Sequence, residues 1–127
     1  MGKKTVVFDF DGVINSYTHG WQGASTITDP PVAGIKEEIA KIRGKYKVVI
    51  MSSRAATPAG RSAIARYLDK HGIIVDNIVD HKIPAHVYID DKAIPFNGKT
   101  SNLMSDIEVF TPWHDSVSVK KYTGTKK

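Results

Sequence analysis

Two aspartates, Asp9 and Asp11, directly follow a short apolar run at residues 5–8 and are followed at once by Gly12. A run of this length, rich in Val and Phe, predicts a buried β-strand. Carboxylates at the carboxyl end of a strand in an open α/β sheet lie where such sheets bind ligands. One of them could act as a nucleophile or metal ligand while the other transfers protons. Asp-x-Asp is also common in ordinary turns. The rest of the chain must therefore decide between a functional pair of acids and a turn.

Polar side chains follow two more predicted strands. Ser52 comes after the apolar run at residues 47–51, and Asp90 and Asp91 come after the run at residues 86–89. The carboxyl ends of parallel strands share one edge of a sheet, so we expect these groups to meet the first two aspartates there. The expected site therefore combines four carboxylates and a hydroxyl.

Two basic residues, Lys82 and Arg54, lie close to these strand ends in the sequence. Clustered carboxylates are unfavourable unless a cation neutralises them, and Mg²⁺ is the simplest cation for an all-oxygen site. Lys82 would then hold phosphoryl oxygens together with Ser52, an arrangement suited to phosphoryl transfer. Arg54 has two open assignments, a contact with substrate phosphate or a structural ion pair with Asp90 or Asp91.

The elements that would position these groups alternate between strand and helix. Ile35, Ile39 and Ile42 recur with helical spacing and predict a helix that begins near residues 30–31 and ends at Gly44. A second helix is predicted to begin at Thr57-Pro58, with Ile64 and Leu68 on its inner face and Gly72 just past its end. Strands are predicted at residues 5–10, 47–51, within 73–79, 86–89 and 107–110. This alternation predicts an α/β fold, a three-layer, Rossmann-like, doubly wound parallel sheet of about five strands.

The segments around these polar groups resemble the four motifs of the haloacid dehalogenase (HAD) superfamily, in the family order. The matching segments are residues 6–14, residues 48–52, Lys82 and residues 87–91. The chain is most similar to small, capless, phosphatase-like members found in bacteriophages and bacteria. Residues 51–54 also resemble the second-motif region of polynucleotide kinase phosphatase domains.

The resemblance implies a role for each site residue. Asp9 would attack phosphorus and form an aspartyl-phosphate, and Asp11 would exchange protons with the leaving group and with water. Mg²⁺ would be held by Asp9, by the backbone carbonyl of Asp11 and by Asp90, with Asp91 bound through water or orienting its neighbours. The phosphate-binding groups implied are Ser52, Lys82, Arg54 and Phe10. Dehalogenases of the superfamily lack an acid at the position of Asp11, so its presence favours phosphate chemistry.

The implied fold has no separate cap domain, because residues 15–29 are too few to form one. We expect residues 1–119 to form one HAD-like phosphohydrolase domain and residues 120–127 a basic, flexible tail. Tyr17, His19 and Trp21 in the long first loop could line the substrate side of an open site, where an aromatic ring could stack on a nucleobase, or could anchor the loop on the domain.

These features predict a Mg²⁺-dependent phosphomonoester hydrolase acting through Asp9. Three alternatives stay open: a polynucleotide 3′-phosphatase, a non-catalytic phosphate-binding or regulatory module, and a phosphotransferase that passes the phosphoryl group to an alcohol. The predicted partner is a phosphorylated small molecule or nucleotide, with a nucleic-acid end as the alternative.

Composition agrees with one compact, cytoplasmic domain that is a monomer or a small homo-oligomer. The 127 residues are 41% hydrophobic and include no cysteine, which excludes disulfides and thiolate metal sites. No apolar run is long enough to cross a membrane, and the first residues lack a signal-peptide pattern. The formal net charge of +5 comes largely from lysines near the two ends, which are either solvated termini or a fringe that attracts phosphate-rich partners.

Overall fold

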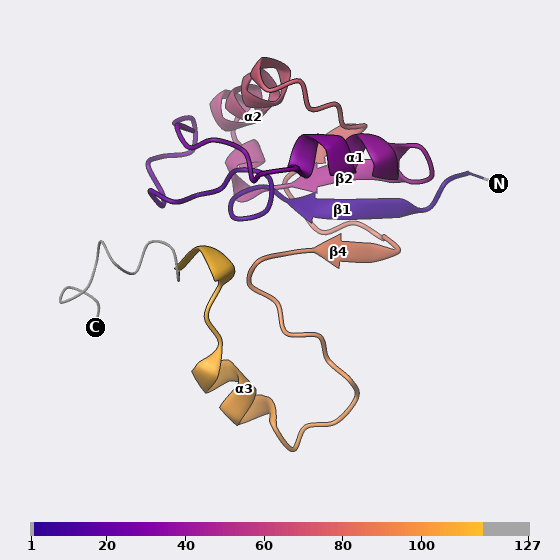
Figure 1. Ribbon diagram of the computed structural model, residues 1–127, viewed down its shortest axis with the longest axis vertical. Helices are drawn as coiled ribbons and strands as arrows, with labels where there is room; N and C mark the ends of the chain where they lie inside the picture. Colours follow the sequence, from indigo (N-terminus) through magenta and orange to yellow (C-terminus); the bar gives the residue numbers. More distant parts are fainter. Residues whose placement is uncertain (1, 116–127) are drawn as a thin grey trace.

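The computed structural model describes residues 2–115, which form a four-stranded, all-parallel sheet with helices. The strands are β1 (Thr5–Asp9), β2 (Lys47–Met51), β3 (Asn77–Val79) and β4 (Val87–Ile89), in the order β3-β2-β1-β4 (Figure 1). Four of the five predicted strands are thus confirmed. Because β1 pairs with both β2 and β4 in parallel register, the carboxyl ends of these three strands lie at one edge of the sheet.

The two predicted helices are α1 (Ile35–Arg43) and α2 (Pro58–Lys70). The α1 helix begins later than Pro30–Pro31, because Gly34 adopts the left-handed conformation with φ 83° and turns the chain into the helix there. The α2 helix begins as predicted, since the Thr57 side chain accepts a hydrogen bond from the Gly60 N–H and caps it.

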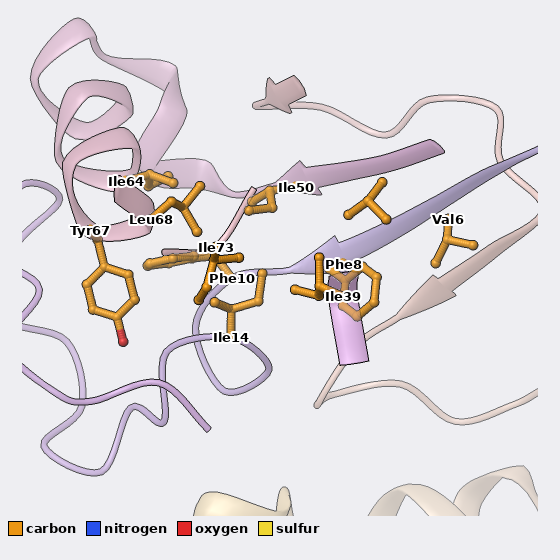
Figure 2. Close-up of a cluster of buried hydrophobic side chains, with 11 residues drawn as sticks. Val6, Phe8, Phe10, Ile14, Ile39, Ile50, Ile64, Tyr67, Leu68 and Ile73 are labelled. Atoms are coloured by element: carbon orange, nitrogen blue, oxygen red, sulfur yellow. The ribbon is translucent and has the colours of Figure 1, made fainter. Parts of the chain in front are cut away.

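The hydrophobic core lies between one face of the sheet and these two helices (Figure 2). Alternate residues of the central strands point into it, and α1 contributes Ile39 while α2 contributes Ile64 and Leu68. Both helices therefore cover the same face of the sheet, which holds β1 and β2 rigidly and fixes where their carboxyl ends lie.

The opposite face of the sheet is crossed by an extended connection instead of a helix. Tyr88 is the register partner of Val7, so its ring is on the face opposite the two helices, and its hydroxyl hydrogen-bonds to the backbone of Ile83 in the connection from β3 to β4. That connection, residues 80–86, is too short for a crossover helix. A doubly wound sheet has crossover helices on both faces. In residues 2–115 the crossover helices α1 and α2 cover one face only, so this part of the prediction is not met.

The fifth predicted strand, residues 107–110, is wrong, since residues 107–109 belong to the helix α3 (Leu103–Val109). Asp106 donates its N–H to the Asn102 carbonyl, and Leu103 and Ile107 repeat with helical spacing, a signal hidden by the apolar Val109-Phe110 pair. Within residues 2–115, α3 buries no side chain. The predicted tail at residues 120–127 lies outside the described residues. Across the described part of the chain, the helices are all too short or too polar to span a bilayer.

Candidate active site

Three carboxylates meet at the edge of the sheet where β1 and β4 end. Asp9 is the last residue of β1, and Asp90 and Asp91 follow β4. One oxygen from each lies within 4.8 Å of the other two, close enough for all three to hold one cation. The structure thus brings together the side chains of three of the four residues predicted to bind the metal; the fourth, Asp11, was predicted to bind through its backbone carbonyl.

Crowding makes the ionisation of this cluster unusual. Burial, a hydrogen bond to Asp91 and the nearby charges of Asp90 and Asp91 together raise the pKa of Asp9 to about 8. Burial alone would raise the pKa of Asp91 too, but hydrogen bonds from Asp9 and His114 outweigh it and lower that pKa. Without a cation, Asp9 therefore keeps a proton at neutral pH and shares it with an ionised Asp91.

Residues from the far end of the described chain hold this cluster in place. The His114 Nε2 lies 2.5 Å from Oδ2 of Asp91, and both side chains are only 4% exposed. Next to it, the Trp113 indole N–H donates to the Gly12 carbonyl at 2.6 Å. Gly12 has a φ of 84°, and a Cβ there would lie 2.3 Å from the Asp91 carboxylate, so only glycine fits between the β1 turn and Asp91.

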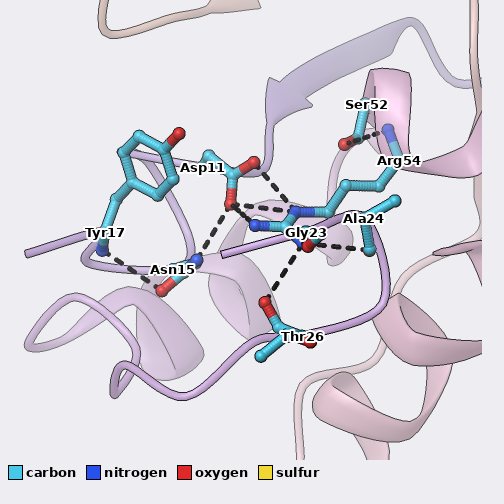
Figure 3. Close-up of polar contacts among 8 residues, drawn as sticks. All are labelled: Asp11, Asn15, Tyr17, Gly23, Ala24, Thr26, Ser52 and Arg54. Carbon is cyan, nitrogen blue, oxygen red and sulfur yellow. Dashed lines mark hydrogen bonds and ion pairs between the residues drawn. The ribbon is translucent and has the colours of Figure 1, made fainter. Parts of the chain in front are cut away.

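Asp11 lies beside the cluster but is held by a different partner, Arg54 (Figure 3). The Arg54 Nε is 2.9 Å from Oδ2 of Asp11, its Nη2 is 3.1 Å from Oδ1, and its side chain is only 1% exposed. Asn15, also buried, donates to the same Oδ1 at 2.9 Å. A doubly bonded guanidinium and an amide fix the orientation of this second acid.

Arg54 also organises the long first loop. Its Nη1 donates to the carbonyls of Gly23, Ala24 and Thr26 at 2.7, 2.9 and 3.3 Å. Because Arg54 follows β2 and its backbone N–H donates to the Ser52 hydroxyl, one buried side chain joins the first loop to two strand ends (Figure 3). The structure thus pairs Arg54 with Asp11 and not with Asp90 or Asp91; its other predicted assignment, a contact with substrate phosphate, stays a prediction.

The other end of the loop is anchored on the domain. Asp29 is buried and accepts hydrogen bonds from Thr18 and from the backbone and ring of His19. The Tyr67 hydroxyl of α2 donates to the Asp29 carbonyl at 2.9 Å. Of the two roles left open for the loop residues Tyr17, His19 and Trp21, His19 therefore takes the anchoring one.

A cavity of about 330 Å³ opens over the carboxylates, a volume within the range of ligand pockets. It is lined by Asp9, Asp11, Tyr17, Trp21, Ser52, Ser53, Asp90, Asp91 and Lys92. A larger cavity of about 500 Å³ lies between the loop and α2. Its lining includes Arg66, Lys70 and His71 but none of the four candidate site residues Asp9, Asp11, Asp90 and Asp91. Size alone therefore does not identify the site.

Of the residues predicted to bind phosphate, Ser52 lines the cavity, whereas Phe10 and Lys82 do not. Ser52 is buried and lines the cavity, as expected for the second strand end. The Phe10 side chain is fully buried in the core against Tyr67, so only the backbone of Phe10 faces the Asp9 carboxylate. Lys82 is exposed, lies over the Tyr88 ring and is absent from the cavity lining, whereas the exposed Lys92 is part of that lining.

Most of the residues that support the site are not predictable from the sequence. Lys92 is the exception in part, because its place directly after Asp91 predicts a local charge partner, and it lines the cavity. Asn15 lies four residues after Asp11, a spacing typical of local side-chain hydrogen bonds. His114 and Trp113 gave no such signal, because their partners lie 23 and 101 residues away.

Binding of a divalent cation is expected to strengthen with pH up to about 8. The cation needs Asp9 ionised, and the crowded cluster raises the pKa of that carboxyl to about 8. Each pH unit below that value therefore weakens binding by about tenfold. Calorimetric titration with Mg²⁺ at pH 6, 7 and 8, in two buffers of different ionisation enthalpy, measures both the affinity and the proton released. Affinity that is constant from pH 6 to 8, with no proton release, would contradict this ionisation scheme.

Comparison with known proteins supports the fold by structure and not by sequence. No protein-family model matches the chain, and no curated protein matches it in sequence. A solved structure, titled as that of the Pnkp1/Rnl/Hen1 complex, is similar at a TM-score of 0.50 with 19% sequence identity. The match covers 90% of this chain and 37% of the other, so this chain spans little more than a third of that protein's length. At this identity the likeness establishes a shared α/β fold.

Proposed function

We propose that this chain is a HAD-like phosphomonoester hydrolase that depends on a divalent cation, with Mg²⁺ the expected ion. The observation that carries the proposal is the convergence of Asp9, Asp90 and Asp91 within 4.8 Å at the sheet edge, with an oriented second acid, Asp11, in the same cavity. An acidic cluster alone could merely be a cation site. A second acid held separately by Arg54 adds the group that a proton transfer requires.

The proposed reaction proceeds in two steps at Asp9. Its carboxylate attacks phosphorus and the ester P–O bond breaks. Asp11 enters this step protonated, gives its proton to the departing alkoxide, and is left as the carboxylate that pairs with Arg54. Asp11 then takes a proton from a water molecule, which attacks the aspartyl-phosphate, releases inorganic phosphate and restores Asp9. The Ser52 hydroxyl would donate to a phosphoryl oxygen, and Lys92, which also lines the cavity, would add positive charge.

The donor set fits Mg²⁺. Its candidate ligands are the carboxylates of Asp9, Asp90 and Asp91, oxygen donors of the kind that this ion prefers. The raised pKa of Asp9 shows how poorly the cluster tolerates a third negative charge on its own. A bound cation would neutralise that charge and let a phosphate dianion approach the ionised Asp9.

The proposal is tested by phosphate release from a panel of phosphomonoesters, with Mg²⁺ and with EDTA. The panel holds sugar phosphates, mononucleotides and a 3′-phosphorylated oligonucleotide, the last because residues 51–54 resemble polynucleotide phosphatases and the net charge is +5. We expect release with Mg²⁺ that falls to background in EDTA and returns when Mg²⁺ is restored. Acceptor alcohols added to the assay detect transfer in place of hydrolysis.

Two results would contradict the proposal. One is release that is unchanged in EDTA. The other is no release from any compound by folded protein that binds Mg²⁺, an outcome that would favour a non-catalytic phosphate-binding module.

A further inference from the structure

We propose that Trp21 is a stacking platform for a nucleobase, so that the substrate is a base-bearing phosphomonoester, either a mononucleotide or the phosphorylated end of an oligonucleotide. This inference rests on the proposed function, because it assigns the phosphoryl group to the carboxylate end of the same cavity. It adds the chemical class of the group attached to that phosphate.

The indole of Trp21 is fixed from one side by a buried cation. The guanidinium carbon of Arg54 lies over the ring, 4.6 Å from its centroid. Arg54 itself is only 1% exposed and is held by Asp11 and the loop carbonyls. The ring therefore has a rigid support, and its position is tied to that of the second acid.

The rest of the ring is open to the cavity. Trp21 is 55% exposed, although tryptophan is on average a highly buried residue. It lines the same cavity as Asp9 and Asp11. A large exposed aromatic surface, held flat by a cation and placed beside a phosphate-binding centre, has the features of a base-stacking site.

The second aromatic residue of the loop forms another wall of this cavity. Tyr17 has a φ of 62°, an uncommon backbone conformation for a residue with a side chain. Its N–H donates to Asn15 Oδ1, and its ring packs edge-on against His114. Because this ring contacts His114, Trp21 is the better candidate for stacking.

Aryl phosphates, such as a phosphotyrosine side chain, would also bring an aromatic ring to this cavity. In them the ring is bonded directly to the phosphoryl oxygen, whereas a sugar separates base from phosphate in a nucleotide. An exposed aromatic ring and a basic residue, Trp21 and Lys92, line the same cavity, a combination that nucleic-acid-binding sites use. These observations favour the nucleotide class, and aryl phosphates become an outcome of the test.

The kinetic test compares substrates that differ only in the base. We would measure kcat/KM for a nucleoside 5′-monophosphate against ribose 5-phosphate, and for a 3′-phosphorylated oligonucleotide against the same strand with an abasic last position. The wild type should prefer the base-bearing member of at least one pair, and the preferred pair identifies the source of the base. Trp21→Ala should reduce that preference by about 10- to 100-fold, and Trp21→Phe should restore most of it.

A binding test that needs no turnover accompanies it. In an Asp9→Asn background, the nucleotide or oligonucleotide should quench tryptophan fluorescence, and Trp21→Phe should remove the quench while Trp113 still emits. Ribose 5-phosphate should give no quench.

The outcomes separate the two proposals. Equal kcat/KM with and without the base, in protein with Mg²⁺-dependent turnover, would overturn the stacking proposal and leave the phosphatase assignment intact. A preference for aryl phosphates over both nucleotide pairs would overturn it as well. If no compound is hydrolysed, the proposed phosphatase function fails, and the presence or absence of the Trp21-dependent quench decides the stacking proposal on its own.

Discussion

An Asp9→Asn variant is expected to lose phosphate release by about 10⁴- to 10⁶-fold, the scale of loss when a covalent nucleophile is removed from an enzyme. The amide has nearly the shape of the carboxyl but cannot form the aspartyl-phosphate. The measurement is kcat with the best substrate of the panel at saturating Mg²⁺.

The same variant is expected to stay folded and to gain stability relative to wild type as pH rises. In the folded, cation-free protein the crowded cluster raises the pKa of Asp9 from 3.8 to about 8, so ionising Asp9 opposes folding. The free energy of unfolding of the wild type should therefore fall as the pH rises from about 4 to about 8, because the unfolded chain loses this proton near pH 4 and the folded chain only near pH 8. Asparagine does not ionise, so the variant lacks this loss. Urea denaturation in EDTA at pH 5 and 8 measures the difference between the two proteins.

Retention of most of the activity by folded Asp9→Asn protein would exclude a covalent intermediate at this residue. Asp69, on α2 and outside the cavity lining, offers a matched control for removal of one carboxylate. Asp69→Asn should leave both kcat and the pH dependence of stability close to those of wild type.

An Arg54→Ala variant is expected to lose about 3–5 kcal/mol of unfolding free energy. The substitution leaves the Asp11 carboxylate and three loop carbonyls without their buried donor. A loss of this size is a large part of the stability of an ordinary domain, so the variant should unfold at much lower urea concentration or fail to fold. Chemical denaturation at pH 7 measures it.

Arg54→Lys separates the charge of this residue from its geometry. Lysine keeps a positive charge near Asp11 but cannot donate to a carboxylate and to the loop carbonyls from one planar group. We expect a smaller loss of stability than in Arg54→Ala, with kcat still reduced because Asp11 is less firmly oriented. A loss of less than about 1 kcal/mol in Arg54→Ala would show that the buried ion pair contributes little to the fold.

The sheet and its main helices were predictable from sequence because their signals are local. Short β-branched runs, helical spacing at Ile35 and Ile39, and the Thr57-Pro58 cap each lie within a few residues of the element they define. The helix α3 was mistaken for a strand because its Val109-Phe110 end has the composition of one. The third layer is replaced by an extended connection because only residues 80–86 join β3 to β4, too few for a crossover helix.

Within the candidate site, the residues that would do chemistry were predictable and those that hold them were not. The acidic strand ends follow from the rule that parallel strands end at one edge. The ion-pair partner of Arg54 is Asp11, 43 residues away, and not Asp90 or Asp91 as predicted. To predict which acid pairs with Arg54, one would need to know the path of the loop at residues 15–31. That path is fixed by a tertiary contact, the hydrogen bond from the Tyr67 hydroxyl to the Asp29 carbonyl.

The bonds from Trp113 to Gly12 and from His114 to Asp91 also set an order of events during translation. All four strands have been synthesised once residue 89 is made, whereas Gly12 and Asp91 receive these partners only after residue 114. The four strands therefore lie in a part of the chain that is made before the two residues that support the acidic cluster. Among residues 2–115, the site is therefore the last part to receive its supporting contacts as the chain is made.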